Sequence, residues 1–372
     1  MEVHKNKLTL EEFHISEKTG FANGDTLEKL PEYFQPWNDL ISRLLELMES
    51  KTVREHVDQL KLLDHKKLSR HAELSLARIQ LSFFVAGYVW QNGRKDPAEK
   101  IPRCIAIPFY GVSESLSLPP VLCYCDAALM NWRAIDPEAN MKTIYLFPGG
   151  HETDTFIRVS VWIELAFAPA IQRILDAMHA AEASDTVSLI NSLEDIAAVL
   201  RKLRELLPCF HDSITVDTFF NVLQHYFGGY GPKTPLLNGL VFEGVRDEPI
   251  NAIPCSAAQT STLPLVDAAL GVKHKPGIRA KFVRFRKHMP LHHRQLIEAV
   301  EQRSQIRQYV TDCNDEALTS AFENCLRELA GFRSDHIKIV TKYVVIPGKG
   351  VTPDIEGMMT SLKCMRNEST GT

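Results

Sequence analysis

The sequence predicts an all-α protein made of two helical domains. Apolar residues recur three and four positions apart along most of the 372-residue chain, which is the spacing of a helix with one buried face. Alternating, strand-like runs are nearly absent. A chain of this length is too long for one compact core. Pro148-Gly149-Gly150 is the strongest break in composition, so we expect a small N-terminal domain over residues 1–148 and a larger C-terminal domain over residues 149–372.

The N-terminal domain is expected to begin with an irregular arm over residues 1–36. Helices should follow at residues 37–48, 53–63 and 70–90, the last of them apolar almost all round in its second half and therefore buried between other helices. Five prolines between positions 97 and 120 predict a loop. Pro120 is expected to open a helix that reaches Trp132, and residues 143–147 to form one short strand.

The C-terminal domain is predicted to consist of long helices. We expect them at residues 154–183, 186–207, 215–227, 257–270 (kinked at Pro264), 278–288, 292–303 and 315–346. Pro347 and Gly348 should stop the last helix, because proline blocks further helix and glycine tolerates the turn. Residues 231–256, rich in Gly, Pro and Asn, are expected to form a long loop.

Composition excludes several classes of protein. A net charge of -4 gives no basic field for nucleic acid or for an anionic membrane. The most apolar run, residues 81–90, is far short of the roughly 20 residues that span a bilayer, and the first 13 residues lack the apolar segment of a secretory signal. We therefore expect a cytoplasmic protein with no nucleic-acid or membrane partner, and a monomer.

Motifs of the common enzyme classes are missing. There is no glycine-rich phosphate loop and no G-x-S-x-G nucleophile turn. Eight scattered cysteines include no C-x-x-C pair, so free buried thiols are expected, and any haem would be held without thioether links. His288, His292 and His293 cluster, but Pro290 interrupts the helical spacing of a metal pair, so a solvated turn is the favoured interpretation.

One histidine lies on the apolar face of the last predicted helix. His336 follows Phe332 by four positions and precedes Ile339 and Tyr343 on the same face. It is either a core histidine whose ring nitrogens are bonded by neighbours, or an axial ligand to haem iron, with its second nitrogen held by a partner. The spacing does not choose between these alternatives.

Other candidates are weak when taken alone. Phe156 and Ser160 share a helix face with Glu164, yet a helical serine usually bonds the carbonyl of the preceding turn. Phe219 could be plain core, and Asp267 with Arg333 could form a buried pair.

Residues 333–343, around His336, strongly resemble the proximal-histidine helix of the indoleamine 2,3-dioxygenase family. The resemblance runs in order through most of the chain, and includes residues 13–16 with 20–21, 33–37, 87–91, 118–122, 239–245 and 256–261. It implies a cytosolic enzyme that inserts both atoms of O₂ across the indole C2–C3 bond of L-tryptophan or a related indoleamine. The product is N-formylkynurenine, and the electron donor is left open.

The resemblance also implies a role for each site residue. The cofactor would be a non-covalent haem b held between long helices of the C-terminal domain, with His336 as the iron ligand, Arg333 and Asp267 as a pair on the propionate side, and Ser256 near the haem edge. Substrate would pack in a distal pocket formed by Phe156, Ser160, Phe219 and Tyr124, with Ser160 at most a hydrogen-bond modulator.

The chain departs from the family pattern mainly on the substrate side. Gln224 stands where the family usually has an arginine that binds the substrate carboxylate, a change worth on the order of 1.5–3 kcal/mol. Residues 350–357 lack the usual Gly-Thr-rich closing loop, and Asp335 replaces an aromatic residue. Two alternatives therefore remain beside the enzyme: an O₂-binding protein like the family's gastropod myoglobins, and a haem or ligand sensor.

Overall fold

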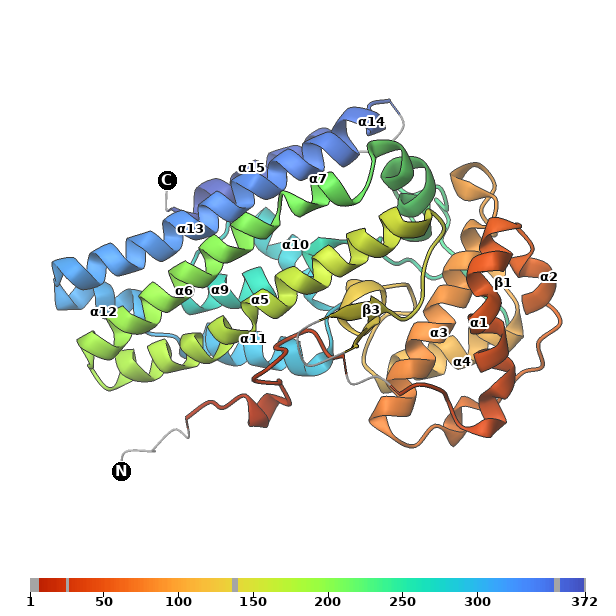
Figure 1. Cartoon of the computed structure of the whole chain (residues 1–372), viewed down its shortest axis with the longest axis horizontal. Coiled ribbons are helices and arrows are strands. Elements are labelled where there is room, and N and C mark those ends of the chain that lie inside the picture. Colours follow the sequence, from red (N-terminus) through yellow and green to blue (C-terminus); the bar gives the residue numbers. More distant parts are fainter. Residues whose placement is uncertain (1–6, 25–26, 136–139, 351–354, 371–372) are drawn as a thin grey trace.

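The computed structural model describes residues 7–24, 27–135, 140–350 and 355–370, and is built almost wholly of helices (Figure 1). The predicted all-α class is confirmed. The described residues contain only four short strands. β1 (Lys100–Ile101) pairs in parallel with β4 (Val241–Phe242), and β2 (Trp132–Ala134) pairs antiparallel with β3 (Met141–Thr143).

Turns, short strands and four helices make up the described chain as far as residue 147, and the three longest described helices, α5, α6 and α13, follow. The first part holds the single turns η1 (Glu11–Phe13), η2 (Glu32–Phe34), η3 (His65–Lys67) and η4 (Gly93–Lys95), the π-turn η5 (Cys125–Leu129), and helices α1 (Gln35–Glu49), α2 (Val53–Val57), α3 (His71–Trp90) and α4 (Arg103–Ser115). The second part holds α5 (Gly150–Glu182), α6 (Thr186–Leu206), α7 (Cys209–Ser213), the π-turn η6 (Thr218–Leu223), α8 (Gln224–Tyr226), the turn η7 (Ala257–Gln259), α9 (Thr262–Ala269), α10 (Pro276–Arg286), α11 (Leu291–Arg303), α12 (Ile306–Cys313), α13 (Glu316–Val340), the π-turn η8 (Thr341–Val345), α14 (Ile346–Gly348) and α15 (Ile355–Ser369).

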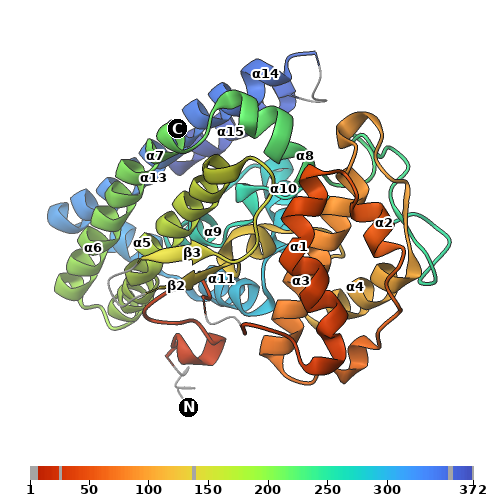
Figure 2. The same cartoon turned by 45° about the vertical axis from the view of Figure 1, so that its right-hand side comes forward.

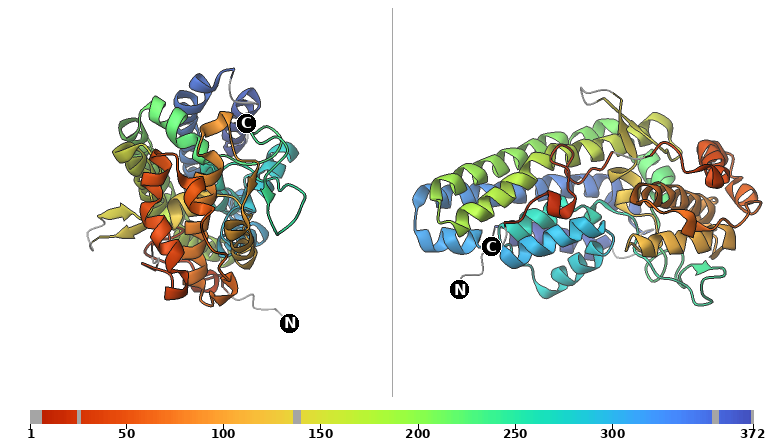
Figure 3. Two further views of the ribbon diagram at one scale, coloured as in Figure 1. Left: turned by 90° about the vertical axis from the view of Figure 1, so that its right-hand side faces the viewer. Right: turned by 90° about the horizontal axis from the view of Figure 1, so that it is seen from below.

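The long helices lie side by side along the long axis and make up one end of the molecule. α1 to α4 make up the opposite end (Figures 1 and 2). α6 packs closely against both α5 and α13, and α15 lies on α13. Aspartates cap two of these helices, because the Asp185 carboxylate accepts from the backbone N–H of Ser188 and that of Asp315 from Leu318. The same division between long and short helices is visible from below (Figure 3).

Two hydrophobic cores hold the fold together. The first gathers α1, α3, α4 and η5, and the second gathers α5, α6, α9, α11 and α13. α5 contributes to both, with Ile157 and Val161 in the first core and Val159 in the second. Leu8 and Phe13 of the N-terminal arm also lie in the second core. Division into domains at residue 148 stays a prediction.

The predicted loop between positions 97 and 120 is wrong, because α4 occupies most of it. Pro102 caps this helix and Pro108 lies inside it. An interior proline costs about 3 kcal/mol, but α4 buries Ile105, Phe109 and Val112 completely. Each such side chain contributes about 1.5–3 kcal/mol on burial, so apolar burial outweighs the lost hydrogen bond.

The predicted helix from Pro120 to Trp132 is also wrong, since only the π-turn η5 forms there. A buried ion pair between Arg78 and Asp126 explains the difference, because both partners also bond the backbone of this segment. The Arg78 guanidinium donates to the Val121 carbonyl (2.5 Å), and the Asp126 carboxylate accepts from the Cys123 N–H (2.8 Å). These bonds engage backbone groups that a regular helix would pair internally.

Smaller differences have local causes. Pro264 is the third residue of α9, in the first turn, where a missing N–H breaks no helical hydrogen bond, so the predicted kink is absent. The helix predicted at residues 53–63 ends at Val57, and the strand predicted at 143–147 lies at Met141–Thr143. α7, α12 and α15 were not predicted. None of the described helices combines the length and apolarity that a membrane crossing requires.

Candidate functional site

His336 lies on α13, and no described residue forms a hydrogen bond with its ring. Burial is the one influence on its pKa, which falls to about 4, so the imidazole is neutral at physiological pH. Part of the residue is nevertheless accessible, so it is recessed rather than sealed in the core. A core histidine with satisfied nitrogens would have bonded neighbours, and His336 has none. The partner expected on the second nitrogen of an axial ligand is likewise absent among the described residues.

An aromatic cluster lies two turns further along the same helix face. Tyr343 follows His336 by seven positions, about 10 Å along the helix axis. Its ring centroid is 5.7 Å from that of Phe219, and Phe219 is 5.3 Å from Phe156. Phe210, which sequence reasoning did not single out, completes the group at 5.2 Å from Phe156. Two of the predicted pocket residues, Phe156 and Phe219, are therefore in contact.

A buried carboxylate network borders this cluster. Glu164 accepts hydrogen bonds from the hydroxyls of Tyr124 (3.2 Å), Thr260 (2.6 Å) and Thr262 (2.8 Å). Burial raises the pKa of Glu164, although the three donors act against the rise. Burial and the Glu164 charge raise the pKa of Tyr124 well above its usual value. Tyr124 thus remains a protonated donor that ties η5 to α5.

Ser160 lies between Phe156 and Glu164 on α5. Its hydroxyl donates to the Phe156 carbonyl at 3.2 Å, the ordinary bond of a helical serine. Its proton is thereby engaged within the helix.

Gln224 is positioned by the π-turn η6. The Gln224 backbone N–H donates to the Phe219 carbonyl, five residues earlier, so Gln224 stands one π-turn above Phe219 on the same side of the helix. The Gln224 amide oxygen accepts a hydrogen bond from Arg94 at 2.6 Å, and the Arg94 guanidinium lies 4.8 Å from the centre of the Phe220 ring. No sequence pattern pointed to Arg94.

Asp267 and Arg333 form a buried ion pair at 2.5 Å. Asp267 also contacts His274 (3.1 Å), and the other ring nitrogen of His274 contacts Glu368 of α15 (2.7 Å). Arg333 donates in addition to the Ser369 hydroxyl. Burial acts to lower the pKa of His274, but its hydrogen bonds to Asp267 and Glu368 and the Asp267 charge outweigh burial and raise it. The pair is therefore part of a network that fastens α15 to α9 and α13.

Ser256 lies at the start of η7, where its hydroxyl accepts from the Ala258 N–H at 3.2 Å. Nearby, Gln259 links this loop to η5, because its side-chain oxygen accepts from the Tyr124 N–H at 2.9 Å. The loop that carries Ser256 is thus joined to the wall formed by Tyr124. Residues 351–354, half of the 350–357 segment that lacks the Gly-Thr-rich closing loop, lie outside the described residues.

The solvated turn predicted around Pro290 is wrong for two of its three histidines. His288 and His293 are buried and His292 is partly exposed, and Pro290 separates α10 from α11. Over the whole described part of the chain, no group of three or more His, Cys, Asp or Glu side chains could hold a metal ion.

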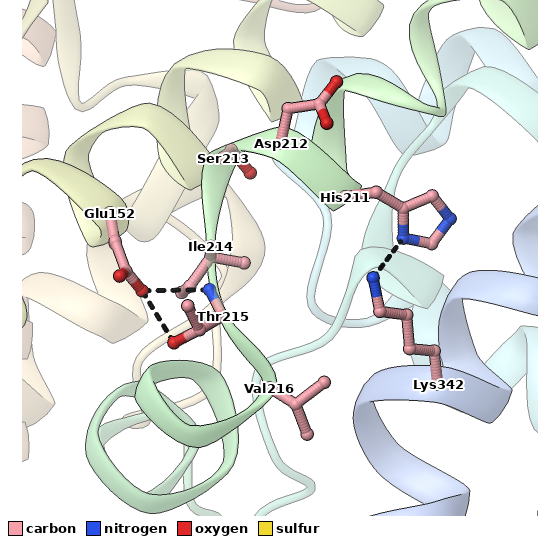
Figure 4. A pocket seen from close by; sticks show the side chains of 8 residues that line it. All are labelled: Glu152, His211, Asp212, Ser213, Ile214, Thr215, Val216 and Lys342. Atoms are coloured by element: carbon pink, nitrogen blue, oxygen red, sulfur yellow. Dashed lines mark hydrogen bonds between the residues drawn. The ribbon is translucent and has the colours of Figure 1, made fainter.

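Figure 4 shows a surface pocket of about 330 Å³ lined by Glu152, residues 211–216 and Lys342. The ring of one lining residue, His211, stacks on Tyr343 of the aromatic cluster, with 5.7 Å between the ring centroids. Two pairs of its polar groups are in contact: Glu152 accepts from the Thr215 N–H and hydroxyl, both at 2.9 Å, and Lys342 lies 3.3 Å from His211. None of the predicted site residues lines it. The pocket is therefore separate from the candidate site.

Comparisons with known proteins show the family of the chain. The family model for indoleamine 2,3-dioxygenase matches residues 9–371. Rat indoleamine 2,3-dioxygenase 1 is 36% identical over 91% of this chain and 86% of its own length, and human indoleamine 2,3-dioxygenase 2 is 34% identical over 91% and 84%. A myoglobin of the abalone Haliotis madaka is 34% identical over 93% of this chain and 92% of its own length. The chain belongs to the indoleamine 2,3-dioxygenase family.

Proposed function

We propose that this protein is a haem-dependent dioxygenase that acts on L-tryptophan or a related indoleamine and forms N-formylkynurenine. The observation that carries the proposal is the neutral His336 imidazole, unpaired among the described residues, on the helix face that also presents Tyr343 to Phe219. Its relatives include proteins named indoleamine 2,3-dioxygenase. Eight unpaired cysteines favour a cytoplasmic location within the same proposal.

The residues present fit a non-covalent haem b. A histidine must be neutral to bind iron, and burial keeps His336 neutral at physiological pH. Asp267 and Arg333 would stand on the propionate side, where their ion pair fixes α13 against α9 and α15. Ser256 would stand at the haem edge. When bound, the haem supplies the oxygen chemistry, and the protein supplies position and polarity.

The chain's own residues would hold the indole ring and limit water. Phe156, Phe219 and Phe210 offer aromatic faces with centroid separations of 5.2–5.3 Å, within the range of favourable ring packing. Tyr124 would form a wall, because its hydroxyl is held by Glu164. Ser160 gives its proton to the Phe156 carbonyl, so we assign it a modulating role only.

A second function, reversible O₂ binding, has one specific observation in its favour. The relatives named myoglobin are as similar to this chain as several of the dioxygenases. Gln224 would permit that role, since an O₂-binding protein needs no group for an amino-acid carboxylate.

Turnover separates the two functions. Full-length protein carrying haem would be reduced without oxygen and then mixed with O₂ and L-tryptophan. We expect N-formylkynurenine to accumulate, measured by its absorbance. Reversible O₂ uptake without product would contradict the dioxygenase and support the second function.

The assignment of His336 has its own test. His336→Ala should lose tight haem binding, measured as haem bound per protein chain after gel filtration. His288→Ala is the matched control, because His288 is also buried, and burial lowers its pKa to about 4 as well. Full haem content in the His336 variant would rule out the assignment.

A further inference from the structure

Arg94 is a half-buried cation without an acidic partner among the described residues. It belongs to η4, directly after α3. Burial is the one influence on its pKa, which it lowers, so no carboxylate acts on the guanidinium. A partly desolvated charge with no counter-ion is costly. By contrast, the buried Arg78 and Arg333 are paired with Asp126 and Asp267.

Arg307 and Arg294 also lose solvent without an ion pair among the described residues, but both have structural partners. Arg307 donates to the Leu270 carbonyl at the end of α9, and Arg294 to the Ser117 carbonyl. Arg94 instead donates to a side chain, the Gln224 amide, at 2.6 Å. It also lies against the Phe220 ring. Its guanidinium is thus oriented by two residues of the helical segment that carries Phe219.

The location of Arg94 follows from two local features. Gly93 has φ of 74°, which suits glycine and turns the chain after α3 so that Arg94 reaches the second half of the molecule. The i to i+5 bond of η6 sets Gln224 above Phe219. The Arg94 guanidinium is therefore held by the residue that stands one π-turn above Phe219. The Gln224 side-chain oxygen accepts from Arg94, and its amide N–H groups donate to no residue in the described part of the chain.

We propose that Arg94, oriented by Gln224, binds the carboxylate of the amino-acid substrate; this rests on the proposed function. The guanidinium donates to the carboxylate oxygens through its remaining N–H groups, and the Gln224 amide donates alongside it. In the family pattern the cation is an arginine at position 224. In this chain the cation is Arg94, which lies 130 positions away in the sequence and contacts Gln224. Gln224 is a positioning residue that also completes the donor set.

Equilibrium binding of two ligands tests this without turnover. L-tryptophan and tryptamine share the indole ring and amine, and only tryptophan has the carboxylate. Calorimetry on the full-length haem-loaded protein should show that Arg94→Gln weakens L-tryptophan binding by about 10- to 100-fold and leaves tryptamine binding unchanged. Lys95→Gln, which removes the adjacent exposed charge, should change neither. Equal losses for both ligands, or no loss, would overturn the proposal.

A charge swap guards against a folding defect in the single variant. Gln224→Arg alone places two guanidinium groups in contact. The double variant Arg94→Gln, Gln224→Arg has the same net charge and composition as the parent. We expect this double variant to bind L-tryptophan more tightly than tryptamine, as the parent does. The proposal would be overturned if the double variant folds but does not regain the preference for L-tryptophan. It would also be overturned if the parent itself shows no preference for L-tryptophan over tryptamine. Carboxylate-selective binding without N-formylkynurenine would instead overturn the proposed function alone.

Discussion

Tyr343 links the aromatic cluster to the backbone that surrounds it. Its hydroxyl lies 3.1 Å from the Phe210 carbonyl and 3.0 Å from the Ile214 carbonyl. Tyr343 and Ile214 are each only 3% exposed, so the bond between them is buried. One hydroxyl therefore fixes the segment that brings Phe210 to Phe156.

Tyr343→Phe tests this link. The variant keeps the ring but removes the shared donor, and we expect a loss of about 1–2 kcal/mol in the free energy of unfolding, measured by urea denaturation. Tyr110→Phe is the control, because the Tyr110 ring packs on Phe242 and no described residue bonds its hydroxyl. Equal stability of the two variants would show that the Tyr343 hydroxyl contributes nothing.

At this scale, sequence reasoning found residues that share one helix and missed those joined by the fold. Phe156 and Ser160 are four apart on α5, and His336 and Tyr343 are seven apart along α13 and η8, so helical spacing predicts their common faces. Arg94 lies 130 positions from Gln224. No local pattern records such a contact.

Among the elements, three π-turns border the candidate site. Tyr124 precedes η5, Phe219 lies within η6, and Tyr343 lies within η8. A π-turn adds a residue to the helical cycle and is often found at functional sites. In η6 the extra residue sets Gln224 above Phe219. Helical periodicity predicted the segments at 215–227 and 315–346 but not these turns, because an extra residue leaves the apolar pattern nearly unchanged.

Long helices were predicted within a few residues because each buries a broad apolar face. α5, α6 and α13 are of this kind. α4 and η5 were missed for opposite reasons. In α4, the burial of apolar side chains outweighs the cost of an interior proline. Before η5, the Arg78–Asp126 ion pair prevents the helix that the apolar spacing predicts. Both outcomes depend on tertiary contacts.

The attachment of α15 should depend on pH. His274 bridges Asp267 and Glu368, and these carboxylates raise its pKa above the usual 6.5. Because the pKa of His274 is higher in the folded than in the unfolded protein, its protonated form adds to the free energy of unfolding. This contribution is fully present below pH 6.5 and is lost as the pH rises through the pKa of His274 in the folded protein. We expect the Tm advantage of the parent over His274→Gln to be largest below pH 6.5 and to shrink above it. A constant or growing difference would contradict the bridge.

On the scale of the whole molecule, the N-terminal arm is part of the helical bundle. Phe13 ends the single helical turn η1 and is only 7% exposed, within the second core. The sequence predicted an arm, but not which core it joins. α5 likewise contributes to both cores, so this one helix links the two cores.

Phe13→Ala should therefore destabilise the entire protein. Removing a buried phenylalanine costs about 3–5 kcal/mol, measured as a shift of the urea midpoint followed by helical circular dichroism. Leu237→Ala, at a side chain that is 66% exposed, is the control and should change little. A midpoint for Phe13→Ala equal to that of the control would show that the arm is not integral to the core.

The central claim is that the protein cleaves an indole with both atoms of O₂ at a haem held by His336. Turnover of L-tryptophan by the reduced, haem-loaded protein under isotopically heavy O₂ tests it most directly, with the product analysed by mass spectrometry. We predict N-formylkynurenine in which both new oxygen atoms are heavy. A reduced protein that takes up and releases O₂ but forms no labelled product would contradict the claim.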